Sequence, residues 1–274
     1  MTDTTETKHA NGMRRLVLVS GATGGIGMAV CQRLLQDGYH VVMLGRSKSK
    51  LEHARRVLLQ AQSQAISDRL SVQVADIAQP SSVDDATHSI LQSHGDITDL
   101  VHAAGDGPVA PLMETTESMW QGTVQGKLLG TVRLTKAVAS RMVQQRRGNI
   151  VIVNGIFSRE ADPLFPISTL VNSGLAGFAK AISHDLGRSG VRVNIVNPGA
   201  TETSLWKKIC GEIAVRHNTT AEAIHQQVRE ASPSGSIAAP ADIADVIAFL
   251  LSPGARHMWG ASVNVDGGAS RAVG

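Results

Sequence analysis

The sequence predicts an α/β fold, a doubly wound, mainly parallel seven-stranded sheet with helices on both faces. Two observations support this prediction. Short apolar runs alternate with helix-length segments from Arg15 onward, an order typical of right-handed βαβ units. Most of the runs are continuous stretches of Val, Ile and Leu, as expected for strands that helices cover on both faces.

The expected elements follow in order along the chain. Strands are predicted over 16–20, 40–44, 70–75, 100–103, 150–154, 191–196 and 262–265. Helices are predicted from residue 25 to about 37 and over 48–64, 82–93, 115–145, 170–188 and 242–251. Pro80 and Pro240 mark two of the helix starts, since proline is favoured in a first helical turn.

The length of 274 residues and the hydrophobic content of 42% fit one well-buried domain. We assign residues 14–274 to that domain and expect residues 1–13, which are polar, to form a disordered tail. The least regular stretch, 205–236, follows the sixth strand. We interpret it as a helical lid, because ligands of open α/β sheets bind at the carboxyl ends of the strands.

Composition excludes several classes of function. The net charge of +3 is spread along the chain, so nucleic-acid binding is not expected. No apolar run reaches about eighteen residues, and the first residues contain no apolar core of a secretory signal. We therefore expect a cytoplasmic protein without a membrane span. Cys31 and Cys210 lack partners at metal-ligand spacing, so no metal site is predicted.

A glycine-rich turn joins the first strand to the first helix. Gly21, Gly25 and Gly27 allow a sharp turn and a close approach of the backbone to a pyrophosphate. Thr23 and Ile26 lie in the same turn, where the helix N-terminus offers free N–H groups to an anion. The alternative is a turn needed only for tight packing of the strand against the helix.

The Gly-x-x-x-Gly-x-Gly spacing resembles that of the short-chain dehydrogenase/reductase family, and the resemblance extends over residues 14 to 270. The family has a Rossmann-type fold and binds a nicotinamide dinucleotide. The resemblance implies that Asp76 contacts adenine and Thr203 the nicotinamide amide. Further matching positions are Ala104 and Gly105 after the fourth strand, Pro198 and Gly199 after the sixth, and the closing segment 259–268.

The residues after the second strand favour NADP(H) over NAD(H). An acidic side chain there would bind the adenosine ribose and repel a 2′-phosphate, but this chain has Gly45 followed by Arg46. The Arg46 guanidinium can bind a phosphate through two hydrogen bonds. Alternatively, it stacks on adenine or faces water.

Four catalytic positions of the family are occupied by other residues here. The resemblance places Lys127 at the asparagine position, Gly155 at the serine, Ser168 at the tyrosine and Asn172 at the lysine. Tyr39 is the chain's only tyrosine and lies in the cofactor half, where a packing role is expected. No phenol is therefore available beside the cofactor, and an aliphatic hydroxyl is a far weaker acid.

Lysine and asparagine have exchanged places in this set. The family's two helices face each other beneath the nicotinamide, so the Lys127 ammonium could enter the space that the usual lysine leaves. A desolvated amine has a lowered pKa and could polarise a carbonyl or donate a proton. The alternative is that Lys127 points away from the pocket or into a subunit contact.

Other polar residues near the pocket are His102, Ser158, Glu160 and Asp162. We expect His102 to be a packed, hydrogen-bonded core residue rather than a catalyst. Glu160 and Asp162 are expected to be solvated.

Two hypotheses for function follow, and fold alone does not separate them. The first is a divergent NADP(H)-dependent oxidoreductase acting on a carbonyl or conjugated alkene of a small, partly apolar substrate. The second is a non-catalytic member, either a structural or regulatory subunit or a cofactor-sensing binding protein. A homotetramer, or a mixed tetramer with a homologue, is expected to form through helices 115–145 and 170–188. Apolar side chains of the lid suggest the substrate's character: Trp206, Ile209, Ile213 and Val215.

Overall fold

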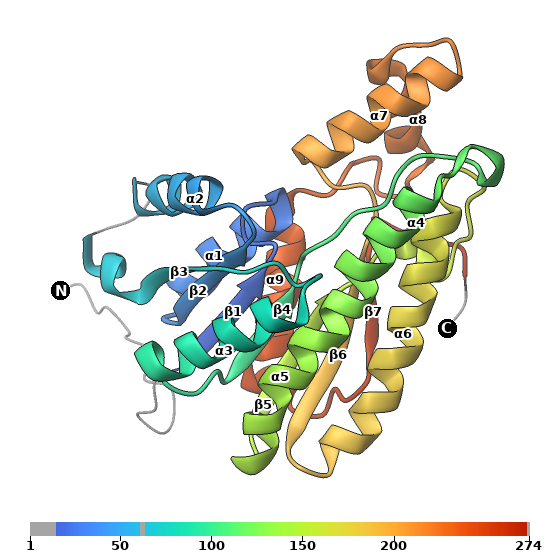
Figure 1. The fold of residues 1–274 in the computed structure, drawn as a ribbon. Coiled ribbons are helices and arrows are strands. Elements are labelled where there is room, and N and C mark those ends of the chain that lie inside the picture. Colours follow the sequence, from blue (N-terminus) through green and yellow to red (C-terminus); the bar gives the residue numbers. More distant parts are fainter. Residues whose placement is uncertain (1–14, 61–63, 273–274) are drawn as a thin grey trace.

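The computed structural model describes residues 15–60 and 64–272. The tail expected over 1–13 lies outside these residues. Seven strands form one sheet in the order β3-β2-β1-β4-β5-β6-β7 (Figure 1), and each neighbouring pair is parallel. The predicted fold class is confirmed.

The strands occupy the predicted apolar runs, with ends that differ by up to two residues. Their bounds are Leu16–Ser20 (β1), His40–Gly45 (β2), Leu70–Val74 (β3), Asp99–His102 (β4), Gly148–Val153 (β5), Val191–Pro198 (β6) and Ser262–Val265 (β7). Successive side chains point to opposite faces of the sheet. Val17 and Val19 therefore pack on one layer of helices, and Leu16 and Leu18 on the other.

Two layers of helices cover the sheet. The layer beneath Val17 consists of α1 (Gly25–Gln36), α2 (Lys48–Gln60) and α9 (Pro240–Leu251). The opposite layer consists of α3 (Pro80–His94), α5 (Gly130–Gln144) and α6 (Pro166–Gly187), with α4 (Glu117–Thr123) preceding α5. No helix in the described part of the chain is long and apolar enough to cross a membrane.

Three of the helix predictions need correction. The helix expected over 115–145 is interrupted by a π-helical turn, Val124–Leu129, which separates α4 from α5. Its wider winding changes which side chains face the core. The helix expected from 170 begins at Pro166, where proline fixes φ in the first turn. Helix α2 is described as far as Gln60. Residues 61–63 lie outside the described part, and the end predicted at 64 comes after them.

The segment predicted as a lid contains two helices, α7 (Ser204–Arg216) and α8 (Ala221–Ala231), which project from the carboxyl edge of the sheet (Figure 1). Trp206 and Ile224 are buried between them, and Ile209 and Ile213 pack on the same small cluster. These side chains therefore mainly form the lid's own core, while Val215 is 84% exposed.

A buried ion pair closes the opposite, amino edge of the sheet. The Arg15 guanidinium lies 2.6 Å from the Asp99 carboxylate, which is fully buried. Asp99 also accepts hydrogen bonds from Thr98 and Asn149, at 2.7 Å each. The Tyr39 ring packs over Arg15 at 4.3 Å, which places the only tyrosine at the edge away from the glycine-rich turn.

Removing the Asp99 carboxylate should be costly, because it leaves the Arg15 charge without its partner. We expect Asp99→Ala to lower the free energy of unfolding by about 3–5 kcal/mol, measured by urea denaturation. Asp245→Ala is the matched control, since the Asp245 carboxylate pairs with Arg33 on the surface and should contribute at most about 1 kcal/mol. Equal effects of the two substitutions would contradict this reading of the amino edge.

Candidate functional site

The glycine-rich turn touches two distant segments of the chain. Gly21 has φ +68°, and a Cβ there would lie 2.4 Å from the Ala103 carbonyl oxygen, just before Ala104 and Gly105. A Cβ on Gly25 would lie 2.5 Å from Cγ2 of Thr203. The turn therefore has no room for side chains, and it brings together the ends of β1 and β4 and the start of α7.

The N-terminus of α1 is open for an anion. Its N-cap, Gly24, supplies no side-chain hydrogen bond within the described structure. Thr23 is exposed, Ile26 packs on the core below, and Gly27 lies against the Gly21 carbonyl, where a Cβ would approach to 2.2 Å. First-turn N–H groups and the helix dipole favour a phosphate at such a position.

Arg46 and Asp76 follow two neighbouring strands at the same edge of the sheet. Arg46 is exposed directly after β2. Asp76, two residues after β3, is half-buried, and its Oδ1 accepts a hydrogen bond from the Ala78 N–H at 3.0 Å. A solvent-exposed guanidinium beside a fixed carboxylate suits an adenosine ribose or its phosphate.

The turn after β6 lies on the other side of the glycine-rich turn. β6 ends at Pro198, and a Cβ on Gly199 would lie 2.9 Å from Cβ of Asp266. The Thr203 hydroxyl caps α7 by accepting from the Trp206 N–H at 3.1 Å, and it donates to the Thr201 carbonyl at 3.1 Å.

Lys127 lies in the π-helical turn and is buried, with 9% of the residue exposed. Its aliphatic chain packs beneath Gly105, where a Cβ would lie 2.7 Å from Cβ of Lys127. Its Nζ donates to the Asn154 carbonyl at 2.8 Å. The side chain therefore points into the protein, toward the end of β5, and not to solvent.

Asn154 links Lys127 to the helix α6. Its Nδ2 donates to the Asn172 carbonyl at 3.1 Å and to Oδ1 of Asn197 at 3.3 Å. The side-chain oxygens Oδ1 of both Asn154 and Asn172 are buried and have no hydrogen-bond partner among the described residues. Buried acceptors of this kind usually have a donor, so these two oxygens are candidate contacts for a ligand hydroxyl or amine.

Burial sets the protonation behaviour of this amine. Desolvation lowers the pKa of Lys127 to about 8, while the negative charge of Asp106 acts in the opposite direction. At neutral pH the amine thus retains its proton, but it can release it far more readily than a surface lysine.

Ser168 and Gly155 lie on either side of this network. Ser168 is buried in α6, and a Cβ on Gly107 would lie 2.1 Å from its Oγ, so the loop after β4 packs directly on the serine. A Cβ on Gly155 would lie 2.9 Å from Nδ2 of Asn172. Ser158 supplies a hydroxyl nearby, with its Oγ 3.1 Å from the Gly155 carbonyl.

The remaining polar residues have structural contacts. His102 is buried, its Nε2 lies 2.9 Å from the Thr135 hydroxyl, and burial lowers its pKa to about 3. Glu160 is partly exposed, as expected, but its carboxylate also has partners in the protein. Its carboxylate accepts three hydrogen bonds from residues near the C-terminus, while Asp162 accepts one from the Leu164 N–H.

The sequence does not reveal the contacts of two of these residues. Nothing in it marks Asn154, an asparagine at the end of a strand, as the centre of a hydrogen-bond network. The partners of Glu160 lie about 110 positions further along the chain, so its contacts depend on the fold.

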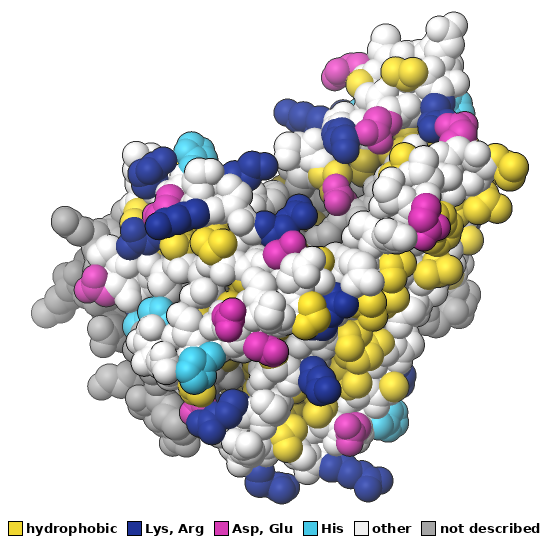
Figure 2. All heavy atoms as spheres, in the orientation of Figure 1, with side chains coloured by type: hydrophobic (Ala, Val, Ile, Leu, Met, Phe, Trp, Pro, Cys, Tyr) yellow, Lys and Arg dark blue, Asp and Glu magenta, His cyan; other side chains and the backbone are white. Residues whose placement is uncertain are grey.

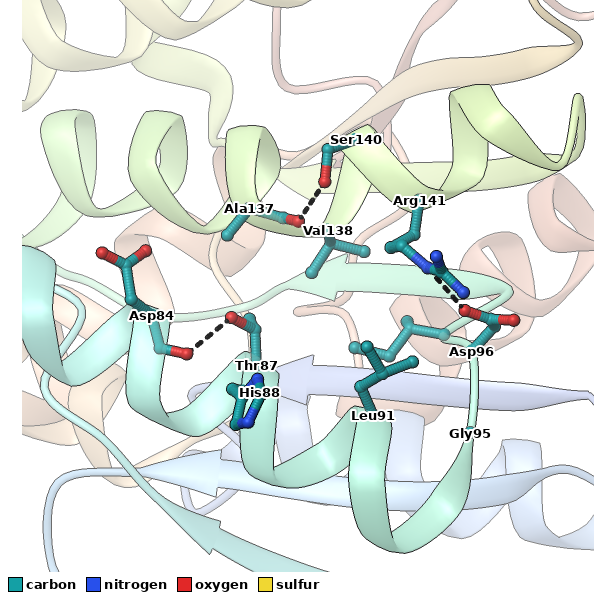
Figure 3. A pocket seen from close by; sticks show the side chains of 11 residues that line it. Asp84, Thr87, His88, Leu91, Gly95, Asp96, Ala137, Val138, Ser140 and Arg141 are labelled. Atoms are coloured by element: carbon teal, nitrogen blue, oxygen red, sulfur yellow. Dashed lines mark hydrogen bonds and ion pairs between the residues drawn. The ribbon is translucent and has the colours of Figure 1, made fainter.

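A groove of about 350 Å³ lies between α3 and α5, far from these residues (Figure 3). It lies near the ends of the helices that lead into β4 and β5, so it belongs to the amino half of the sheet. Its polar groups are largely engaged, since Thr87 and Ser140 bond to their own helices and Arg141 pairs with Asp96. We therefore place the functional site at the carboxyl edge, where the surface is hollowed beneath the lid (Figure 2). Within the described residues, no cluster of His, Cys, Asp and Glu could hold a metal ion.

The parallel sheet, the glycine-rich turn and the open helix N-terminus together define a dinucleotide-binding α/β domain. A family model described as enoyl-(acyl carrier protein) reductase matches residues 21–270. The chain therefore belongs to this family, which is part of the short-chain dehydrogenases/reductases.

Relatives span almost the whole chain. A putative ketoacyl reductase of the monensin polyketide synthase from Streptomyces virginiae is 28% identical, over 93% of this chain and 96% of its own length. The 3-oxoacyl-acyl-carrier-protein reductase of Vibrio cholerae is 29% identical, over 93% and 96%. The structure of an actinorhodin polyketide ketoreductase variant with NADPH has a TM-score of 0.89 at 25% identity, over 94% of this chain and 98% of that one.

The lowered pKa of Lys127 predicts that its buried charge destabilises the fold at neutral pH and that this effect disappears at high pH. Between about pH 8 and its usual value of 10.5, the unfolded lysine holds a proton that the folded one has released. The free energy of unfolding therefore rises with pH through this window. Below about pH 8 the folded protein bears the full cost of burying the charge. We expect Lys127→Met to raise the free energy of unfolding at pH 7 by up to about 3 kcal/mol.

The gain should disappear above pH 10.5, which urea denaturation of both proteins at pH 7 and near pH 10.5 would measure. Lys136→Met is the control, because Lys136 is exposed on the next helix. A constant difference between Lys127→Met and the unsubstituted protein at both pH values would contradict the lowered pKa.

Proposed function

We propose that this protein is an NADP(H)-dependent oxidoreductase in which the Lys127 amine takes over the proton chemistry. Its substrate class is a carbonyl compound or conjugated alkene of small, partly apolar character. The observation that carries the proposal is the buried hydrogen bond from Lys127 to the end of β5, beside Asn172. The NADPH-bound ketoreductase relative supports the cofactor and the reaction class.

The residues present fit a nicotinamide dinucleotide. The side-chain-free turn at Gly21 and Gly25 suits a pyrophosphate at the N-terminus of α1. Arg46 would pair with a 2′-phosphate, and Asp76 would lie beside the adenine. The unpartnered Oδ1 of Asn172 is an acceptor suited to a ribose hydroxyl, at the position where the family's lysine binds the ribose.

Three segments of the chain would form the nicotinamide side of the site. Ala104 and Gly105 follow β4, Pro198 and Gly199 follow β6, and Thr203 begins the lid. Bound there, NADPH would supply a hydride to the substrate.

The proton then has to come from the protein or water. An ammonium has three N–H donors, and the Asn154 carbonyl uses one of those on Lys127. The others are available to polarise a substrate oxygen or to donate a proton to it. Ser168 would donate a hydrogen bond to the same oxygen, but its hydroxyl is too weak an acid to protonate it.

The contacts of the changed residues favour a remodelled site over a merely relaxed one. The loop at Gly107 packs on Ser168 without room for a side chain. Lys127 from the π-helical turn would take the place of the family's lysine on α6, since both segments bond to Asn154. The second hypothesis, a non-catalytic subunit, would place no such demand on Lys127.

Substituting Lys127 tests the proposal. With NADPH and a panel of ketones and enoyl thioesters, we expect Lys127→Met to lower kcat by about 100-fold or more. In the unsubstituted protein, kcat for reduction should fall as the pH rises through about 8, because the ammonium loses its proton. Steady-state NADPH oxidation measures both effects.

Lys136→Met again serves as the control, and NADPH affinity should remain within about threefold in both variants, a change below about 1 kcal/mol. Turnover that survives Lys127→Met would remove the lysine from the mechanism. A protein that binds NADPH, turns over nothing in the panel and co-purifies with an active homologue would favour the non-catalytic subunit.

Arg46 tests the cofactor preference. We expect Arg46→Ala to weaken NADPH binding by about 10- to 100-fold, since a charge-assisted pair contributes about 1.5–3 kcal/mol, and to leave NADH binding unchanged. Fluorescence titration of both cofactors measures this, with exposed Lys50→Ala in α2 as the control. Equal weakening of NADPH and NADH would mean that Arg46 stacks on adenine.

We also propose that the chain assembles as a homotetramer or as a mixed tetramer with a homologue. Hydrophobic side chains gather on the outer face along α5 and α6 (Figure 2). Leu170, in α6, is 53% exposed. An apolar helical face of this kind is suited to contact a second chain.

A further inference from the structure

The last described residues of the chain form a tight turn beside the site. The Asp266 carboxylate accepts hydrogen bonds from the Gly268 N–H at 3.0 Å and the Ser270 N–H at 3.1 Å. Both bonds point the backbone of residues 268–272 back toward the loop between β5 and α6. We call residues 266–272 the C-terminal segment.

Glu160 holds this segment from the loop side. Its Oε1 accepts from the Ser270 hydroxyl at 3.0 Å, the Arg271 N–H at 2.5 Å and the Ala272 N–H at 2.7 Å. These bonds, that from Ala272 most of all, hold the pKa of Glu160 below its usual range. Three donors on one carboxylate oxygen form a specific contact, not a chance surface pairing.

The same segment also contacts residues 232–236, at the end of the predicted lid, which we call the lid base. The Gly267 carbonyl accepts from the Ser232 hydroxyl at 3.1 Å and from the Ser234 N–H at 3.0 Å. Just before it, the Val265 carbonyl accepts from the Gly199 N–H at 3.1 Å, in the turn after β6. The segment thus connects the lid base and the Pro-Gly turn to the loop that holds Glu160.

That loop leads directly into the candidate catalytic helix. The rings of Phe157 and Phe165 stack at 4.4 Å, and Phe165 is the residue before α6, on which Ser168 lies. The Leu164 carbonyl accepts from the Ala110 N–H at 2.9 Å, which fastens the loop to the segment after β4. A movement of Glu160 would therefore shift this loop on the substrate side of the site.

We propose that Glu160 is a positioning residue: through it, the C-terminal segment acts as a latch that holds the loop 155–165 and the lid base in one arrangement. When the contact breaks, the segment leaves the loop, and the loop and lid base lose their common anchor. This role does not depend on the redox activity proposed above, since neither the cofactor nor Lys127 takes part in the contact.

Trypsin gives a direct readout, because the bond after Arg271 lies inside the latch. A protease needs a locally extended chain, so the cleavage rate reports how often the segment is released. We expect Glu160→Ala to accelerate release of residues 272–274 by about tenfold or more, and Glu160→Gln, which keeps one acceptor oxygen, to act more weakly. Mass spectrometry of the released peptide measures the rate.

Hydrogen exchange of the full-length protein separates positioning from simple tethering. In Glu160→Ala we expect faster exchange in 156–165 and 232–236, with unchanged protection of the strands β4, β5 and β6. Glu230→Ala is the control, since Glu230 is exposed on α8 near the lid base and should change neither readout.

Two results would overturn the proposal. One is cleavage after Arg271 at the unsubstituted rate in Glu160→Ala. The other is a released segment with unchanged exchange in 156–165, which would make Glu160 a tether without a positioning role. Neither readout uses turnover or NADPH, so they remain informative even if the protein proves to have no redox activity.

Discussion

The hydrogen bond from the buried Lys127 amine to the Asn154 carbonyl is the contact on which the candidate site depends. A buried lysine loses hydration, and one carbonyl compensates for only part of that loss. The side chain would turn to solvent unless the π-helical turn directed it inward and Gly105 left space above it. Both features keep the amine in its buried position, as the proposed role of Lys127 requires.

Among the described residues, buried polar groups are hydrogen-bonded at the amino edge of the sheet, whereas several lack partners at the carboxyl edge. At the amino edge, Asp99 is saturated by Arg15, Thr98 and Asn149, and the result is a stable structural cluster. At the carboxyl edge, buried polar atoms lack partners among the described residues: Ser20 Oγ, His102 Nδ1, Asn154 Oδ1 and Asn172 Oδ1. Unsatisfied polar atoms cost stability in a core. Their concentration where strands end in this fold is the expected property of a ligand site.

The sequence predicted the sheet and the glycine-rich turn well because both depend on local signals. Apolar runs mark buried strands, and the spacing of Gly21, Gly25 and Gly27 marks the turn. The direction of the Lys127 side chain was not predictable in this way. A regular helix over 115–145 allowed it to point inward or outward, and only the π-helical turn decides the matter. Asn154 and Glu160 depend on partners brought close by the fold, so no pattern around them in the sequence reveals their contacts.

Most of the residues that the family resemblance places at catalytic positions meet in one hydrogen-bond network, and this network bears on the proposed function. Ser168 packs against Gly107, where an added Cβ would lie 2.1 Å from its Oγ. The Lys127 amine donates to the Asn154 carbonyl, and the Asn154 side chain donates to the backbone carbonyl of residue 172, so both segments meet at Asn154. A site that is no longer under selection for catalysis would be expected to drift toward apolar, more stable packing, since burying a charge is unfavourable. Retaining a buried ammonium is the reverse of that drift, and it supports the proposal of a remodelled catalytic site over that of a non-catalytic subunit.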